Sequence, residues 1–272
     1  MNSLSAREQK KEEIKKSRAG SITEGVIWKQ LLLFFFPILF GTFFQQLYNT
    51  VDAIIVGRFV GKEALAAVGG STGMLINLLV GFFVGLSSGA TVIISQFYGA
   101  QNEDRVGEAV HTAMAFSLVC GLGMTVIGLL FGRTALEAMG TPAEIMDYSL
   151  SYLNIYFIGI ITNLIYNMGS GILRAIGDSK RPLYFLMASC LTNIVLDIVL
   201  VVVLRMEVRG AAIATVFSQL VSAILVVFAL MRTTDSYKLI IRKIRLNLFM
   251  VKRIIKIGLP AGLQSVMYAL SN

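Results

Sequence analysis

Long apolar blocks separated by short polar breaks make up most of this chain. Each block holds about 20 or more residues with few charges, which is the length that a helix needs to cross the hydrocarbon of a bilayer. Inside lipid every backbone N–H and C=O needs a partner within its own segment, so these blocks are predicted to be helices. Six spans are predicted, and a seventh begins near Ile254. The six are Trp28–Gly57, Ala64–Gly89 (or on to Tyr98), Ala109–Phe131, Tyr148–Leu173, Leu183–Leu204 and Ala211–Met231.

Composition agrees with the hydrophobic pattern. Of the 272 residues, 56% are hydrophobic and 15% are charged, whereas soluble domains carry about 25% charged residues. We therefore expect an all-α integral membrane protein. Met1–Gly20 is charged and lacks the apolar core of a secretory signal, so the first span is expected to direct insertion. Cys120 and Cys190 both lie in apolar blocks, which favours two core residues over a disulfide or a metal site.

The basic residues gather on one side of the predicted spans. Most of the 24 Lys and Arg residues lie before the first span or in the segments after the second, fourth and sixth spans. Because basic loops stay in the cytoplasm during insertion, the N-terminus is predicted to be cytoplasmic, in a plasma membrane or prokaryotic inner membrane. The net charge of +8 is thus explained by orientation and by contact with anionic lipid head groups. A nucleic-acid partner is not favoured.

A weak internal repeat suggests that the chain is half of a larger fold. Lys29 precedes Pro37 by eight residues, and Lys252 precedes Pro260 by the same distance. Six spans return the chain to its starting side, so the seventh would run parallel to the first, as in a parallel repeat. We therefore expect a missing C-terminal bundle of the same protein. The expected parts are a basic cytoplasmic segment at 1–26, a six-helix bundle at 27–231, a basic cytoplasmic linker at 232–253 and a truncated first helix of the second bundle at 254–272.

Two acidic residues lie well inside the predicted spans. Asp52 is near the outer end of the first span and Asp197 is past the middle of the fifth, so both are expected in the outer half of the membrane. A charge inside a bilayer is costly, so both side chains should face the bundle interior. Asn193 lies four residues before Asp197 and therefore shares its helix face. The polar residues expected to accompany Asp52, and to line a cavity, are Gln45, Tyr48 and Asn49.

Buried acids of this kind suit a site for a cation or a proton. A carboxylate inside a low-dielectric bundle can capture a proton, and carboxylate, amide and hydroxyl oxygens also suit a hard cation such as Na+. The alternative is a structural hydrogen bond or, for Asp52, contact with water at the interface. Met168 and Met187 fit either apolar filling or the lining of an adaptable pocket. The sequence shows no nucleophile–His–acid set, metal-ligand cluster or phosphate-binding loop, so an enzyme is not expected.

Small residues mark one face of the second span. Gly81, Gly85 and Gly89 recur at every fourth position. Small residues at this spacing let two helix backbones approach each other in a membrane, so a close helix–helix contact is predicted there. The alternative is a flexible functional helix.

Four motifs, in the same order along the chain, resemble those of one transporter family. Residues Gln46–Arg58 (QLYNTVDAIIVGR) look like its first helix, and Ser95–Ala100 (SQFYGA) is similar to its signature at the end of the second helix. Leu173–Pro182 (LRAIGDSKRP) resembles its loop between the fourth and fifth helices. Asn193–Asp197 (NIVLD) matches the acidic motif of its fifth helix. The family is that of the multidrug and toxic compound extrusion (MATE) transporters, and the likeness covers the chain from about Ile27 onward.

This resemblance implies a fold, a function and a site. The fold is two six-helix bundles, of which the chain holds one half, and the function is export of cationic or amphipathic compounds driven by Na+ or H+. The residues that would bind the coupling cation are Asp52, Asp197, Asn193 and Thr215, with Na+ held by Asp52, Asn193 and Asp197. No further cofactor is implied. The family commonly has Pro after its helix-five acid, whereas this chain has Ile198, so a kink at that point is in doubt.

We therefore predict a cation-coupled antiporter for organic cations or other amphipathic small molecules. One alternative is a flippase or exporter of lipid-linked oligosaccharides with a related fold. Such a protein should line its cavity with Arg and Lys to hold phosphates, and the predicted spans show no buried basic residue. The other alternative is a membrane scaffold that transports nothing and shows no ion-dependent change of conformation.

Overall fold

The computed structural model describes residues 27–271, so the predicted basic segment at 1–26 lies outside the described residues. The described part is helical and contains no strand. In chain order its elements are α2 (Ile27–Phe59), α3 (Lys62–Gly69), α4 (Ser71–Gly99), α5 (Glu103–Ala138), α6 (Ala143–Ala175), α7 (Lys180–Asp197), the π-helix η1 (Ile198–Val203), α8 (Glu207–Arg232), the short 3₁₀-helix η2 (Ile241–Lys243) and α9 (Leu248–Ser271).

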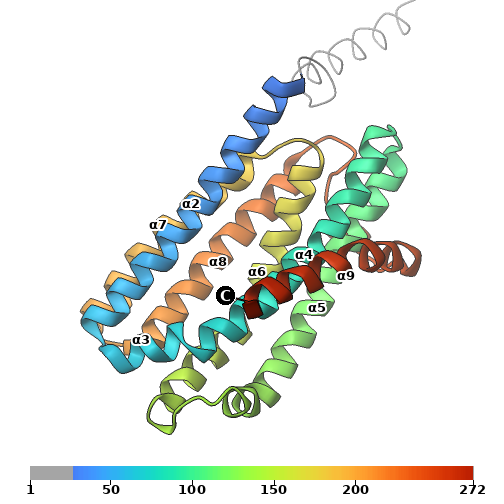
Figure 1. Cartoon of the computed structure of the whole chain (residues 1–272). Helices are drawn as coiled ribbons and strands as arrows, with labels where there is room; N and C mark the ends of the chain where they lie inside the picture. The colour runs from blue at the N-terminus through green and yellow to red at the C-terminus, as the bar shows by residue number, and fades with distance from the viewer. Residues whose placement is uncertain (1–26, 272) are drawn as a thin grey trace, which may run out of the picture.

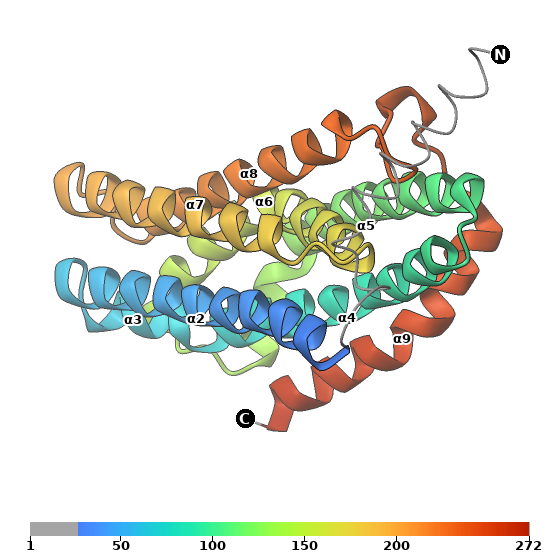
Figure 2. The same ribbon diagram turned by 90° about the horizontal axis from the view of Figure 1, so that it is seen from above.

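The long helices form one bundle whose members run up and down in turn (Figure 1). In Figure 2, α2 lies alongside α7, and α8 lies beyond α7 in the same direction. Helix α6 packs against α4, α5 and α8 and is therefore the centre of the bundle. We call the end that carries the α4–α5 loop, the α6–α7 loop and the residues 233–247 the linker end, and the opposite end the far end.

The predicted spans are confirmed as helices, but several boundaries were wrong. The second span is broken at Gly70 into α3 and α4, because the turn between Gly69 and Ser71 interrupts the helix. The seventh helix begins at Leu248 instead of near Ile254. Five helices of the described part are long and apolar enough to cross a membrane. Together with α2, which is 33 residues long, they give the six-span bundle that was predicted.

The outer surface of the bundle is strongly apolar. On α5, Leu130 is 69% exposed and its neighbour Phe131 is 59% exposed. A soluble protein rarely exposes large apolar side chains in continuous bands, whereas hydrocarbon chains cover them at no cost. The protein is therefore an integral membrane protein.

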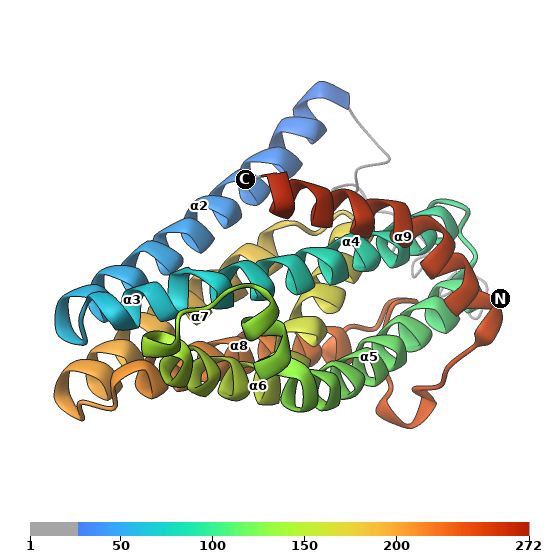
Figure 3. The same cartoon turned by 60° about the horizontal axis from the view of Figure 1, so that its bottom comes forward.

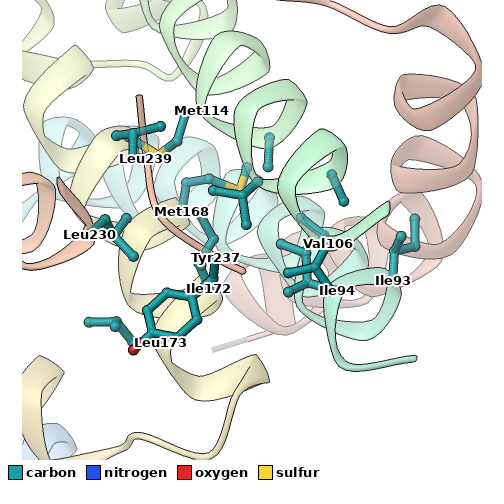
Figure 4. Packing of buried hydrophobic residues seen from close by; sticks show 14 of the residues in the cluster. Ile93, Ile94, Val106, Met114, Met168, Ile172, Leu173, Leu230, Tyr237 and Leu239 are labelled. Atoms are coloured by element: carbon teal, nitrogen blue, oxygen red, sulfur yellow. The ribbon is translucent and has the colours of Figure 1, made fainter. Parts of the chain in front are cut away.

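Two clusters of buried apolar side chains hold the bundle together, one at each end. The cluster at the far end joins α2, α3, α5, α6, η1 and α8. The cluster at the linker end joins α4, α5, α6, α8 and α9, and it also includes Tyr237 and Leu239 from the segment after α8. Figure 4 shows these two side chains among Met168, Ile172 and Leu173. The segment between α8 and α9 is thus anchored in the core by its own apolar residues.

The closest helix–helix contact is that of α4 with α9, which lie side by side in Figures 1 and 3. Gly85 and Gly89 of α4 meet Gly258 and Gly262 of α9 backbone to backbone. A Cβ at Gly258 would lie 2.5 Å from the carbonyl oxygen of Leu86. The small-residue contact that the spacing of Gly81, Gly85 and Gly89 predicts is therefore confirmed.

His111 of α5 fixes the segment 233–247 between α8 and α9, called the linker below, at a second point. Its Nε2 accepts a hydrogen bond from the backbone N–H of Ile240 at 3.0 Å, and its Nδ1 lies 2.6 Å from the carbonyl oxygen of Gly107. These partners favour the neutral ring with the proton on Nδ1, which donates to Gly107. Glu108, also on α5, accepts a hydrogen bond from the side chain of Asn247.

The α4–α9 contact predicts that one added methyl group lowers the stability of the protein markedly. We expect Gly85→Ala to destabilise the protein by about 1–3 kcal/mol, because the new Cβ would collide with the backbone of Gly262. Gly81→Ala is the matched control, since a Cβ there would meet Ser265 at 3.6 Å, an ordinary contact. The fraction of monodisperse protein after heating measures the effect. Equal loss for both variants would contradict the explanation.

The His111 hydrogen bond predicts that the linker depends on this side chain. We expect His111→Leu to expose the segment 233–247 to trypsin, because the Ile240 N–H loses its acceptor. Time courses of limited proteolysis compare it with Asp104→Asn, an exposed position on the same helix. Unchanged cleavage in His111→Leu would show that Tyr237 and Leu239 alone hold the linker.

Candidate functional site

Helices α2 and α7 bring the two intramembrane acids together. Asp52 is 7% exposed and Asp197 is fully buried, and the two carboxyl groups are near enough to interact electrostatically. On α7, Leu191 and Val195 point outward and are 64% and 59% exposed. Because one face of α7 is apolar and exposed while the other carries Asp197, the acid is turned into the bundle. The expectation that both acids face the interior is confirmed.

Asn193 and Thr215 complete a buried polar cluster with the two acids. Asn193 is fully buried one turn before Asp197, and Thr215 of α8, the helix that packs on α7, is 2% exposed. Several of the cluster's polar atoms have no hydrogen-bond partner among the described residues. They are Oδ1 of Asp52, both carboxyl oxygens of Asp197, both side-chain amide atoms of Asn193 and Oγ1 of Thr215.

So many buried oxygens without partners are rare in a native protein. Each costs roughly 1–3 kcal/mol when it has neither water nor a hydrogen bond. The shared property of the set is an excess of acceptors, which suits a cation or a proton. The described part of the chain has no group of three or more His, Cys, Asp or Glu side chains that could hold a metal ion.

Tyrosines surround this cluster. Tyr152 of α6 is buried and Tyr48 of α2 is half-buried, and both lie close to Asp52 and to the hydroxyl of Thr215. Tyr156 stacks with Tyr152, with ring centroids 6.5 Å apart, and lies beside the side chain of Gln219.

Sequence reasoning missed Tyr152, Tyr156 and Gln219. A signal was present for the tyrosines, because polar residues recur along α6 at spacings of three, four or seven. The positions are Tyr152, Tyr156, Asn163, Asn167, Ser170 and Arg174.

The helix that carries Asp197 changes its winding directly after the acid. At Ile198 the α-helix becomes the π-helix η1, which ends with a hydrogen bond of 2.9 Å from the N–H of Leu204 to the carbonyl oxygen of Val199. A π-helical turn is rare and is often found at functional sites. Where the family commonly has proline, this chain therefore widens the helix at Ile198.

A cavity of about 240 Å³ lies between α2, α4, α6, α7 and α8, on the linker side of the cluster. Tyr48 lines it and is also near Asp52, so this residue connects the cavity with the acids. Many of its other wall residues are polar. They are Thr42, Gln45, Asn163, Tyr166, Asn167, Arg174, Ser179, Ser189, Ser218, Gln219 and Ser222.

Some of the residues predicted to line a cavity do so in the structure, and others do not. Gln45 and Tyr48 line the cavity. Asn49 is exposed, lies 3.5 Å from the side-chain oxygen of Gln46 and is not part of the cavity wall. Met168 is buried in the apolar cluster of the linker end, and Met187 is half-buried outside the cavity wall.

One predicted helix end was too early. The fourth span was expected to end at Leu173, which placed Arg174 in a loop. Helix α6 in fact continues to Ala175, and the partly buried Arg174 in its last turn lines the cavity. The turn that follows depends on Gly177, whose φ of 93° suits a residue without a Cβ.

Comparison with known proteins agrees with this fold. The MatE family profile matches residues 37–199. The probable multidrug resistance protein YoeA of Bacillus subtilis (strain 168) is 31% identical over 253 residues, which cover 90% of this chain and 54% of that protein.

Solved structures give the same result. A crystal structure of MATE in the bent conformation has a TM-score of 0.82 at 27% identity, and covers 91% of this chain and 55% of that chain. The outward-facing conformation of a multidrug resistance MATE family transporter of the MOP superfamily has a TM-score of 0.81 at 27% identity, with 89% of this chain and 54% of that chain covered. The chain thus spans about half the length of these relatives. Since the profile covers more than half of the chain, the chain belongs to the MatE family.

Proposed function

We propose that the full-length protein is a cation-coupled antiporter that exports amphipathic small molecules in exchange for Na+ or H+. The observation that carries the proposal is the buried cluster of Asp52, Asp197, Asn193 and Thr215, in which several buried polar atoms have no hydrogen-bond partner among the described residues. Relatives described as multidrug resistance proteins support the same class of substrate.

The chemistry follows from charge in a low-dielectric place. Two ionised carboxyls near each other repel, and this repulsion acts between α2 and α7, because Asp52 lies on one helix and Asp197 on the other. A proton or Na+ removes the repulsion and lets the two helices close. Release of the cation reverses the change, and the α2–α7 contact then has two arrangements of similar free energy.

The cavity beside the cluster gives this change an effect on the substrate. Tyr48 on α2 belongs both to the cavity wall and to the surroundings of Asp52. A shift of α2 on binding the cation would therefore alter the shape of the cavity. In the full-length protein, rocking of the two bundles would open the cavity to one side of the membrane at a time.

The charge of the two ends supports an orientation of the bundle in the membrane. Exposed basic residues crowd the linker end, which by the positive-inside tendency would face the cytoplasm. They include Lys238, Arg242, Lys243 and Arg245. The coupling acids lie toward the far end and would meet cations from the outside.

A flippase for lipid-linked oligosaccharides is less well supported. Its cavity should offer several basic groups for phosphates, and Arg174 is the one charged residue in the described cavity wall. A scaffold without transport would leave the cluster of unpartnered oxygens without a purpose.

One prediction of the proposed function concerns cation coupling. We expect Asp52→Asn combined with Asp197→Asn to abolish gradient-driven efflux of a fluorescent organic cation from vesicles holding the full-length protein. An amide binds neither a proton nor Na+ as a carboxylate does, so the driving reaction is lost. The control is Asp147→Asn, an exposed acid of α6 outside the cluster. Imposing a Na+ gradient or a pH gradient alone identifies the ion, and undiminished efflux in the double variant would refute coupling at this pair.

Another prediction of the proposed function concerns Thr215. We expect Thr215→Val to raise the cation concentration for half-maximal efflux by about tenfold, because an oxygen ligand is replaced by a methyl group of similar size. Thr215→Ser keeps the hydroxyl and should restore most of the affinity. An equal effect of both substitutions would mean that Thr215 acts only through packing.

A further inference from the structure

Arg174 is the one charged residue among the described side chains that line the cavity. It extends from the last turn of α6, and the wall residues contributed by α2, α4, α7 and α8 include no Asp, Glu or Lys. A guanidinium cannot lose its proton in a protein, so its charge has to be balanced where it stands. A partly buried cation without a counter-charge is costly, and this cost points to a ligand.

No carboxylate of the described residues forms an ion pair with Arg174. The acid nearest in sequence is Asp178, and both of its carboxylate oxygens have other partners. Its Oδ1 accepts the backbone N–H groups of Lys180 and Arg181 at 3.2 and 3.1 Å, and its Oδ2 pairs with the guanidinium of Arg181 at 2.9 Å. The loop therefore neutralises Arg181 and leaves the charge of Arg174 to the cavity.

Hydrogen-bond donors lie at the same end of the cavity. Ser179 is buried, lines the cavity and makes no capping hydrogen bond with α7, although it occupies the N-cap position. Tyr166, two turns before Arg174 on α6, donates its hydroxyl proton to the carbonyl oxygen of Pro182 at 3.1 Å and so ties the start of α7 to the wall. A fixed wall with a guanidinium and a free hydroxyl suits an oxyanion, which Arg can bind through two parallel hydrogen bonds.

This end of the cavity is well separated from the acid cluster. Arg174 lies 22 positions after Tyr152, the residue of α6 beside Asp52, which corresponds to about 33 Å along the helix. A drug-sized molecule bound at Arg174 therefore cannot also touch the acid cluster. The positive end of the cavity is therefore a site of its own, and not part of the cation site.

We propose that Arg174 and Ser179 form an oxyanion subsite at the linker end of the cavity, which binds the carboxylate or phosphate group of an amphipathic small molecule. The inference rests on the proposed transport function and extends its substrates from cations to zwitterions and anions. The negative group binds at Arg174, and the apolar body lies along Pro37, Val84 and Leu186 of the wall.

The test compares a carboxylated rhodamine with its methyl ester, two dyes that differ only in the charge of one group. Fluorescence anisotropy measures their binding to the full-length protein in a neutral detergent, without any gradient. We expect the wild-type protein to bind the acid more tightly than the ester. Arg174→Gln should weaken binding of the acid by about tenfold and leave binding of the ester within about twofold, as is typical of one charge-assisted hydrogen-bonded pair.

Matched variants separate local binding from general charge and from folding. Lys180→Gln removes one positive charge from an exposed position at the same helix junction and should change neither affinity. Arg174→Lys keeps the charge but cannot form two parallel hydrogen bonds with an oxyanion, and it should retain part of the preference for the acid. Equal affinities of the wild-type protein for acid and ester would overturn the proposal without any variant, and so would parallel losses for both dyes in Arg174→Gln.

Competition identifies the source of the oxyanion. Phosphatidylglycerol and benzoate are titrated separately against the bound acid dye, with phosphatidylcholine as the control lipid. Displacement by benzoate supports a soluble substrate, displacement by phosphatidylglycerol alone supports a lipid head group, and displacement by neither overturns the subsite. Asp52→Asn should keep the preference for the acid dye, so a failure of cation coupling and a failure of the Arg174 subsite give different results.

Discussion

The structure depends on one electrostatic constraint, which is that two carboxyl groups share a buried place between α2 and α7. At an effective dielectric constant of about 20, two charges about 4 Å apart repel by about 4 kcal/mol. That energy is a large part of the stability of a whole domain. The cation or proton proposed above would remove this repulsion within the buried pair. Asn193 and Thr215 extend this constraint, because they add amide and hydroxyl groups without partners to the same place.

The packing of the bundle is suited to a change at this pair. Helix α4 is locked to α9 by glycine contacts that leave no room for a methyl group at Gly85 or Gly89. Helix α2 lies at the edge of the bundle beside α7, with the cavity along its inner face. A change of charge between Asp52 and Asp197 therefore acts on the helix pair that is bordered by empty space, and not on the pair that is tightly packed.

Much of this fold could be predicted from the sequence because lipid imposes simple rules. Apolar length predicts spans, and a glycine every fourth residue predicts the α4 contact surface. The inward direction of Asp52 and Asp197 was also predictable, since hydrocarbon excludes a bare charge. The break at Gly70 was not, because glycine occurs within membrane helices as well as between them.

The missed residues show why pattern alone could not define the site. Tyr152 and Tyr156 are amphipathic side chains, and a tyrosine in a membrane helix fits the lipid interface as well as it fits a buried cluster. Arg174 lies only one position beyond the predicted end of its span, so a small error in the helix end moved it from the cavity to a loop. Whether such a residue faces water or a cavity depends on α2, α7 and α8, which are distant in sequence.

Taken together, the two charged features give the bundle a polarity of its own. The acids lie toward the far end, the guanidinium of Arg174 lies at the linker end, and the cavity between them is lined by hydroxyls, amides and apolar side chains. A neutral amphiphile would find no preferred orientation from charge in such a space, whereas a zwitterion would. Its negative group is drawn to Arg174, and its positive group is left in the part of the cavity that leads toward the acids. Because Arg174 and the acids are too far apart for one molecule to touch both, an exchange of cation for substrate would depend on the proposed shift of α2 and not on direct attraction between the two sites.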